Sequence, residues 1–278
     1  MLLAVEPHGD ATRLVLASPT SRLLGYTASV YVVAAEGGAV LVDTGFPFAW
    51  RDVRRYLDAR GGRGGARAAI RGALLTHQHE DHAGNAPRLA ALGVPLAMAD
   101  ATRRAIARVA PIAAYRRYTW GRMPALAAGA AAFDPAPLVL VATPGHTSDH
   151  HAVWDPERET LYGGDLFLGV QVRVAHPSED PRALARSLRR AAALRPRRLF
   201  DGHRGPVPDP VAALEAKAAW TEDTVAAVEQ LIDRGWPDAR IRDALFGGES
   251  AVGRLSRGEY SRAAFVGAVR RTRGAADA

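Results

Sequence analysis

The 278-residue chain contains no cysteine, and this absence narrows the chemistry that it can perform. Without thiols there are no disulfides and no thiolate metal ligands, so a bound metal must be held by imidazole and carboxylate groups. No apolar run approaches the length that spans a bilayer. The first residues also lack a basic region ahead of an apolar run, so no signal peptide is indicated and we expect a cytoplasmic protein.

Lysine is almost missing as well, because Lys217 is the only one among 36 basic residues. The net charge of +7 allows a nucleic-acid partner. We favour solvated surfaces instead, since arginines such as Arg182, Arg186 and Arg189 fall at helical spacing. The expected partner is therefore a small-molecule substrate, without nucleic acid or membrane, and a homodimer stays open.

Strands and helices alternate over about the first 205 residues, which is typical of a layered α/β domain. Gly37-Gly38 marks a hairpin, the glycines at 61, 62, 64 and 65 end a helix, and Asp100 is expected to cap another. Asp180-Pro181 and Asp209-Pro210 signal two further helix starts. We expect a catalytic domain over 1–210 and a helical extension over 211–278, whose apolar residues (Val225, Val228, Leu231 and Ile232) pack on that domain or mediate dimerisation.

The segment His77-Gln78-His79-Glu80-Asp81-His82 places four candidate metal ligands within six residues. It follows a short apolar strand, so His77 and His79 project to the same side of the extended chain. Three more candidates each come just after an expected strand: His146 in TPGH, Asp165 in YGGD and His203 in FDGH. One such histidine alone is weak evidence, but the set together indicates a metal centre.

This order of motifs, preceded by Asp43 in LVDTG, resembles the metallo-β-lactamase superfamily over roughly residues 10–210, and most closely its glyoxalase II-like branch. The resemblance implies an αββα four-layer sandwich, here with a C-terminal helical extension. It also implies a site with two metal ions. The implied ligands are His77, His79 and His146 for one ion, and Asp81, His82 and His203 for the other, with Asp165 bridging.

The resemblance implies that Asp43 orients the ligands, and the alternative is a turn-forming aspartate. His150 is expected to support the ligands rather than to bind metal. Imidazole and carboxylate suit zinc, and also iron or manganese. Two divalent ions carry more positive charge than Asp81 and Asp165 neutralise, which favours a bridging hydroxide with a pKa near 7 as the nucleophile. We therefore assign the catalytic role to the metal-holding Asp81 and Asp165.

The expected reaction is cleavage of a small thioester, lactone or ester. Three rivals stay open: a phosphodiesterase or nuclease, a mononuclear iron dioxygenase of the persulfide type, and a scaffold without enzyme activity. His79 stands where the flavodiiron oxidoreductases carry glutamate, which favours hydrolysis. Leu168 stands where quorum-quenching lactonases carry tyrosine, and the tail differs from the glutathione-binding tail of glyoxalase II.

The substrate pocket is expected in loops around the metals, with core filling as the equal alternative for its aromatic residues. Our candidates are Phe46, Tyr115, Tyr118, Trp120, Arg122 and Phe167.

Overall fold

The computed structural model describes residues 1–61 and 70–274, which form two compact units. The first unit contains Met1–Val141, His151–Gly164 and Leu199–Val207. The second contains Ala142–His150, Asp165–Arg198 and the chain from Pro208 onward. The chain therefore passes between the units several times, and the expected boundary at residue 210 stays a prediction.

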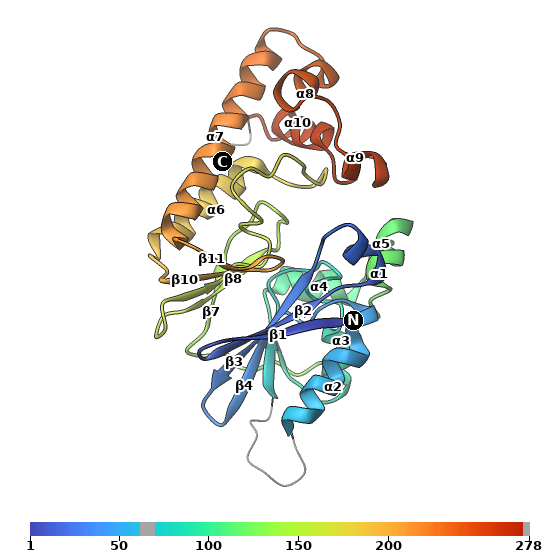
Figure 1. The fold of residues 1–278 in the computed structure, drawn as a ribbon, viewed down its shortest axis with the longest axis vertical. Helices are drawn as coiled ribbons and strands as arrows, with labels where there is room; N and C mark the ends of the chain where they lie inside the picture. Colours follow the sequence, from blue (N-terminus) through green and yellow to red (C-terminus); the bar gives the residue numbers. More distant parts are fainter. Residues whose placement is uncertain (62–69, 275–278) are drawn as a thin grey trace. The chain divides into compact units, whose positions relative to one another are not determined.

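The first unit contains two β-sheets (Figure 1). The six strands of one sheet lie in sequence order, and their bounds are β1 Leu2–His8, β2 Ala11–Leu16, β3 Ala28–Ala35, β4 Gly38–Val42, β5 Ile70–Leu74 and β6 Leu96–Ala97. The other sheet has the order β11-β10-β9-β8-β7, and its bounds are β7 Val139–Ala142, β8 His151–Asp155, β9 Thr160–Tyr162, β10 Arg198–Asp201 and β11 Gly205–Val207. The hairpin at Gly37-Gly38 is confirmed, with β3 and β4 antiparallel.

Strands β4, β5 and β6 run parallel, and this direction positions the site. The carboxyl ends of parallel neighbours meet at one edge of a sheet. Asp43 follows β4 directly, and Thr76 and His77 follow β5 after one intervening residue, so segments distant in the chain come together there. The backbone N–H of Asp43 donates to the Leu74 carbonyl at 2.8 Å, which extends the pairing beyond the strands.

Apolar side chains of the two sheets face each other and form a core of the first unit. Tyr31, Val42 and Leu74 of one sheet pack with Tyr162 and Phe200 of the other. Helices cover the opposite face of the six-stranded sheet, and in Figure 1 α2 and α3 lie beside its strands. The helices of this unit are α1 Pro19–Leu23, α2 Trp50–Gly61, α3 Ala86–Ala91, α4 Asp100–Ala107 and α5 Ala114–Trp120, with a short 3₁₀ turn at Pro47–Ala49.

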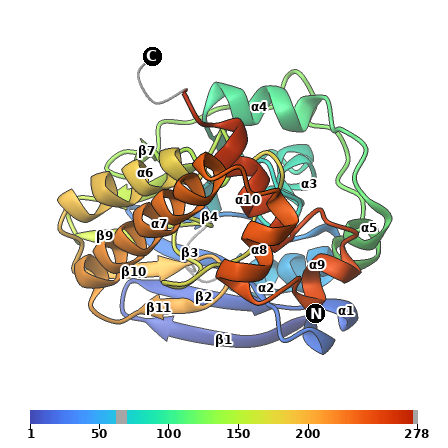
Figure 2. The same ribbon diagram turned by 90° about the horizontal axis from the view of Figure 1, so that it is seen from above.

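Helices dominate the second unit, and Figure 2 shows α6 and α7 running side by side. Its helices are α6 Pro181–Ala193, α7 Pro210–Asp233, α8 Asp238–Phe246, α9 Ala251–Leu255 and α10 Arg262–Arg271. Val225 and Val228 of α7 pack against Ile241 of α8 and Phe265 of α10. These positions of the tail therefore fill a core among the tail helices, a use that we did not expect from their spacing.

The helix starts agree only partly with the sequence signals. Asp180 caps α6 as expected, since its side chain accepts the backbone N–H groups of residues 182 and 183. The capping role of Asp100 is wrong, because Ala99 holds the cap position and Asp100 is the first helical residue. Asp209 is the N-cap residue of α7, but its backbone is left-handed with a φ of 45° instead of extended, and its side chain makes no capping hydrogen bond. Of the helix-ending glycines, Gly61 is the last residue of α2, and those at 62, 64 and 65 lie outside the described residues.

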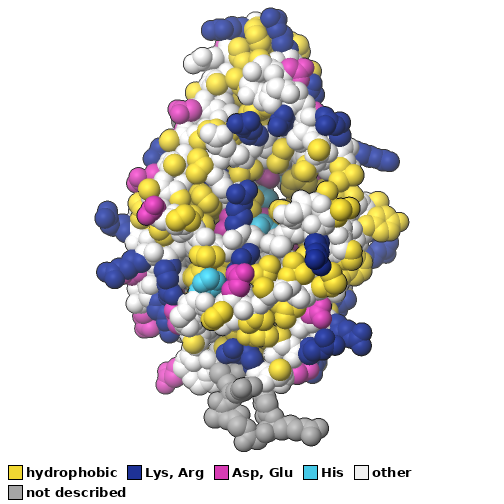
Figure 3. Space-filling view, viewed as in Figure 1, with side chains coloured by type: hydrophobic (Ala, Val, Ile, Leu, Met, Phe, Trp, Pro, Cys, Tyr) yellow, Lys and Arg dark blue, Asp and Glu magenta, His cyan; other side chains and the backbone are white. Residues whose placement is uncertain are grey.

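Basic side chains are scattered over the face in Figure 3, among acidic and apolar ones, rather than gathered in one patch. Several are paired: Arg189 with Glu222 and Arg182 with Glu229. Among residues 1–61 and 70–274, no helix combines the length and the apolar character needed to cross a membrane.

Candidate metal centre

Two groups of histidine and aspartate side chains have the composition of metal-binding sites. One consists of His77, His79, His146 and Asp165, and the other of Asp81, His82 and His203. All members of the second group belong to the first unit, and their ligand atoms lie within 4.8 Å of one another. All seven residues had been selected from the sequence.

Asp43 lies at the centre of a buried hydrogen-bond network at the ends of β4 and β5. Its carboxylate is 2.8 Å from Nδ1 of His82 and accepts the Thr76 hydroxyl at 2.9 Å and the Thr76 backbone N–H at 2.9 Å. The Thr76 hydroxyl is in turn 3.0 Å from Nδ1 of His77. Asp43, Thr76, His77 and His82 are each at most 3% exposed. Asp43 also has a φ of 61°, so the turn and the orienting role coincide in one residue.

This network decides which nitrogen of each ring carries hydrogen. A carboxylate only accepts, so in a neutral ring Nδ1 of His82 must donate to Asp43. The Thr76 hydroxyl gives its hydrogen to Asp43, and its oxygen therefore accepts the Nδ1 hydrogen of His77. In both rings the lone pair is then on Nε2, which is the atom that a metal ion would bind.

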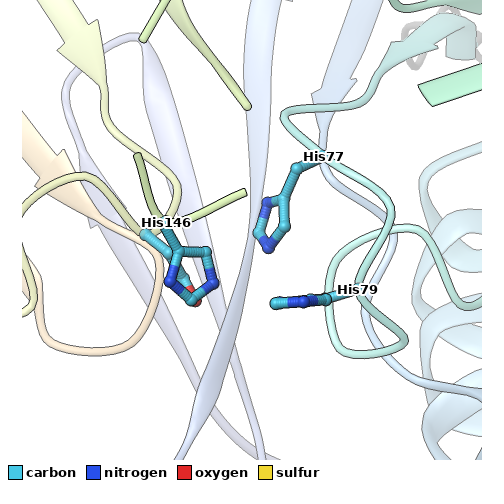
Figure 4. A group of neighbouring side chains, drawn as sticks. His77, His79 and His146 are labelled. Atoms are coloured by element: carbon cyan, nitrogen blue, oxygen red, sulfur yellow. The ribbon is translucent and has the colours of Figure 1, made fainter. Parts of the chain in front are cut away.

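Figure 4 shows the rings of His77 and His79 on the loop after β5, with His146 also labelled. The centroids of the His77 and His79 rings are 4.7 Å apart and their planes are inclined at 72°. The alternation along the extended segment therefore brings both rings to the same side, as the sequence predicted.

His203 follows β10 and is held by contacts on both of its ring nitrogens. Nδ1 is 2.5 Å from the Thr27 carbonyl, an acceptor, so the lone pair of the neutral ring is again on Nε2. Nε2 lies 3.7 Å from Oδ2 of Asp81 and 2.9 Å from the hydroxyl of Tyr26. Tyr26 and a metal ion would compete for this lone pair. Nε2 of His82 is 3.9 Å from the same Asp81 oxygen, so both imidazoles face one carboxylate.

The second unit contributes His146 and Asp165. Nε2 of His146 is 3.2 Å from Oδ2 of Asp165, and its Nδ1 is 3.2 Å from Oε1 of Glu179. Glu179 therefore orients this ring as Asp43 orients His82. The backbone N–H of Asp165 donates to Nε2 of His150 at 3.1 Å, while Nδ1 of His150 is 2.8 Å from the Thr143 hydroxyl. With Nε2 accepting from the main chain, the geometry gives His150 a supporting contact with Asp165.

Gly145 allows the loop before His146 to lie directly on α6. Its φ is 142°, and a Cβ atom at this position would meet the Leu184 backbone at 2.4 Å. The Gly145 carbonyl accepts the Asp180 N–H at 2.8 Å, and the Ser187 hydroxyl donates to the Pro144 carbonyl at 2.7 Å. The glycine of the TPGH motif is thus explained by packing within the second unit.

A buried ion pair connects the histidine-rich loop with α5. Nη2 of Arg116 is 2.5 Å from Oε2 of Glu80, and both side chains are less than 10% exposed. Burial raises the pKa of the Glu80 carboxyl, and the guanidinium of Arg116 opposes that rise. The pair holds α5 against residues 77–82, and the sequence did not point to Arg116.

The proposed pocket residues lie partly in the core and partly at the surface, and Tyr115 of α5 is half-buried. Phe46 is fully buried and its ring centroid is 5.0 Å from that of Trp120, which is 7% exposed, so both pack in the core of the first unit. Tyr118 is 76% exposed, and Arg122 is exposed as well. Phe167 is buried within the second unit. A cavity of about 490 Å³ lies beside β6 and residues 132–140, and no candidate ligand lines it.

Tyr26, Glu179 and Arg13 also support candidate ligands and had no sequence signal. Tyr26 stands on an irregular segment between α1 and β3, and Glu179 precedes α6 without any motif. Arg13 points from β2 to the loop of β10, where its Nη2 donates to the His203 carbonyl at 2.7 Å. Each of them acts through a contact between residues distant in sequence, which a single chain does not reveal.

The donor set suits divalent metal ions. In four histidines, one in the second unit and three in the first, Nδ1 is held by a carboxylate, a hydroxyl or a carbonyl. Such contacts fix the tautomer and direct Nε2, as around metal sites in general. Nitrogen and carboxylate ligands are compatible with zinc, iron and manganese.

Comparison with known proteins agrees with this geometry. The model of the metallo-beta-lactamase superfamily matches residues 24–203, and the chain belongs to this superfamily. This superfamily is a family of hydrolases that usually bind divalent metals.

Two animal proteins named as homologues of beta-lactamase-like protein 2 are similar to the chain. The Drosophila melanogaster protein is 30% identical over 206 residues, which are 73% of this chain and 67% of that protein. The Caenorhabditis elegans protein is 27% identical over 208 residues, 74% of this chain and 65% of its own. The fungal thioesterase pkgB of Emericella nidulans is 30% identical over 193 residues, 66% of this chain and 49% of its own. The match thus spans about two thirds of the animal relatives and half of the fungal one.

Solved structures confirm the fold. A metallo-beta-lactamase family protein from Thermus thermophilus aligns with a TM-score of 0.65 at 20% identity and covers 94% of this chain and 93% of its own. A metallo-beta-lactamase from Pontibacter korlensis aligns with a TM-score of 0.60 at 18% identity, over 80% of this chain and all of its own.

Proposed function

We propose that the protein is a two-metal hydrolase that cleaves a small ester-like bond, a thioester, lactone or ester. The observation that carries the proposal is shared by His77, His82, His203 and His146: an oxygen atom contacts Nδ1 of each ring, which places the lone pair of the neutral imidazole on Nε2, the atom that a metal ion would bind. This arrangement suits metal binding better than general-base catalysis by one histidine.

In the proposed site His77, His79 and His146 would hold one ion, and Asp81, His82 and His203 would hold the other, with Asp165 as a further ligand. When bound, such ions polarise the scissile group and lower the pKa of water. The residues of this chain set the ligand geometry: Asp43 orients His82 and, through Thr76, His77, while Glu179 orients His146. We propose zinc as the metal, with iron and manganese as the alternatives that metal analysis of the purified protein would identify.

A thioester is the first substrate class to test. The fungal relative named as a thioesterase supports it, although the match covers only 49% of that protein. The net charge of +7 would also attract an anionic substrate such as a phosphodiester. That alternative calls for a direct comparison of the two classes rather than a test of one.

The deciding experiment combines metal analysis with a substrate panel. Protein purified without chelator is analysed for zinc, iron and manganese per chain and is then assayed with thioesters, lactones, carboxylic esters and phosphodiesters. We expect two metal ions per chain and turnover of at least one carboxylic substrate, lost on chelation and restored by metal. One iron per chain with oxygen consumption on a persulfide would contradict the proposal. Phosphodiester turnover alone, with a steep salt dependence of binding, would replace it with the nuclease alternative.

A further inference from the structure

Lys217 occupies an unusual place for a lysine. It lies in α7 of the C-terminal helical extension, is 1% exposed, and is the only lysine of the chain. Its ammonium donates to the Leu166 carbonyl at 2.9 Å and also to the Phe167 carbonyl. These two carbonyls belong to the residues directly after Asp165. The contact is within the second unit and joins segments 50 and 51 residues apart in sequence.

Burying this ammonium is costly, since a charged group loses its hydration. Every other basic side chain is arginine, so composition alone would favour arginine at this position too. The contact needs a compact group, because two successive carbonyl oxygens converge on one point. An ammonium has three donors around one nitrogen, whereas the planar fork of a guanidinium is larger and spreads its donors. The local geometry therefore calls for lysine.

The loop with Asp165 is consequently held on both sides. Before the side chain, the Asp165 backbone N–H donates to His150, and after it the next two carbonyls accept from Lys217. Leu168, which ends this stretch, has a left-handed φ of 52°, so the backbone turns sharply there. Between these anchors the Asp165 carboxylate faces His146 at 3.2 Å.

We propose that Lys217 is a positioning residue that holds the Asp165 loop in the shape required for metal binding. The C-terminal helical extension thereby takes part in forming the metal site. This inference rests on the proposed function, in which Asp165 is a metal ligand. The expected loss of metal affinity on removing the Lys217 ammonium distinguishes this role from a simple electrostatic effect, because removing a positive charge would by itself favour binding of a cation.

The test is the zinc affinity of Lys217→Met, measured by competition with a chelator of known affinity. Methionine keeps the length of the apolar stem but cannot donate to the two carbonyls. We expect zinc to bind about 10- to 100-fold more weakly than to the wild type, as for other residues that orient ligands. Leu214→Ala is the matched control, since Leu214 is fully buried on the same helix and makes no such polar contact. Unfolding by urea of the metal-free proteins measures how much each change destabilises the fold.

Equal zinc affinity of Lys217→Met and the wild type would overturn the inference. So would a loss no larger than that of Leu214→Ala, since Lys217 would then act on stability alone. If the wild-type protein itself binds no divalent metal, the proposed function fails, and the two failures are thus distinguished.

A second variant keeps the test decisive where Lys217→Met does not fold. The natural chain has no cysteine, so Lys217→Cys introduces a single thiol that can be modified in denaturant before refolding. Aminoethylation of that thiol rebuilds a lysine-like ammonium, and methylthiolation leaves an apolar side chain. We expect wild-type zinc affinity only after aminoethylation. Equal affinity of the two refolded products, or weak binding by a folded aminoethylated protein, would contradict the inference.

Discussion

The candidate ligands of the first and second units are held in different ways. In the first unit, Asp43 and Thr76 at the ends of parallel strands orient His77 and His82 through a network that is almost fully buried. In the second unit, His146 is oriented by Glu179 from a loop, and the side chain of Glu179 is 12% exposed. Asp165 is fixed through its backbone by His150 and by the carbonyls that Lys217 binds.

The difference shows two routes to the same result. Strand ends are rigid and close to each other by topology, so short side chains are sufficient to orient the ligands there. Loops have no such scaffold, and longer side chains from α7 and from the segment before α6 supply the contacts. Removing one member of a buried network also costs more stability, because the remaining polar groups cannot form replacement hydrogen bonds with water.

Removing a ligand should have the largest effect in either unit. Asp165→Ala and His146→Ala in the second unit, and His203→Ala in the first, should each lower turnover by far more than the roughly hundredfold limit for orienting residues. Activity is measured in the metal-loaded state and folding by circular dichroism, and we expect folded, inactive proteins. Normal turnover by a folded variant would remove that residue from the ligand set.

His82→Ala sharpens the comparison between the units. It leaves the buried Asp43 without its imidazole partner, whereas Asp165→Ala acts at a loop. The metal-free His82→Ala protein should therefore lose about 1–3 kcal/mol more stability than the metal-free Asp165→Ala protein. Equal losses in urea unfolding would argue against the contrast.

The next effect concerns the orienting carboxylates. Asp43→Asn should weaken zinc binding about 10- to 100-fold, because the amide keeps only one acceptor oxygen, whereas the carboxylate uses one oxygen for the Thr76 N–H and the other for His82. Glu179→Gln should have a smaller effect, since this side chain is partly solvated and holds one ring. Asp58→Asn is the control, because Asp58 is exposed on α2 and pairs with Arg54 on the same helix. A larger loss for Glu179→Gln than for Asp43→Asn would reverse the contrast between the units.

What the sequence could predict follows the same division. The HxHxDH segment and the strand ends carry chemistry and position together, so the seven ligand candidates came from local patterns, whereas the orienting role considered for Asp43 came from the family resemblance. Glu179, Tyr26 and Lys217 contact the site region across more than 30 residues of chain, and no periodicity or motif marks them. The same limitation applies to Phe46 and Trp120, since an aromatic residue near a motif can face a substrate or the core, and here the two rings pack together in the core.

Tyr26→Phe tests a contact of the first unit with a smaller expected effect. The Tyr26 hydroxyl is 2.9 Å from Nε2 of His203 and competes with a metal ion for that lone pair. Without the hydroxyl, zinc should bind about fivefold more tightly, which corresponds to one hydrogen bond of about 1 kcal/mol. Chelator competition measures it, with Tyr118→Phe as the control, because Tyr118 is 76% exposed. Weaker binding in Tyr26→Phe would mean that the hydroxyl supports the metal instead.

The smallest effect belongs to a region of the second unit that holds no candidate ligand. Glu249 accepts the backbone N–H groups of Arg262 and Ala263 at the start of α10, and that of Ser250. Burial raises the pKa of its carboxyl, but these hydrogen bonds outweigh burial and hold the pKa below the ordinary value of 4.5. Because the folded pKa is depressed, the stabilisation is present above about pH 4.5 and is lost as the pH falls through the lower folded pKa.

Glu249→Gln should therefore cost about 1 kcal/mol at pH 7, as for other helix caps, and progressively less in acid. Urea unfolding between pH 3 and pH 7 checks this, with the exposed Glu222→Gln, expected to cost about 0–1 kcal/mol, as the control. The zinc affinity of Glu249→Gln should equal that of the wild type, because the Glu249 contacts, unlike those of Lys217, do not involve the Asp165 loop. A changed zinc affinity would mean that the end of the tail around Glu249 also influences metal binding.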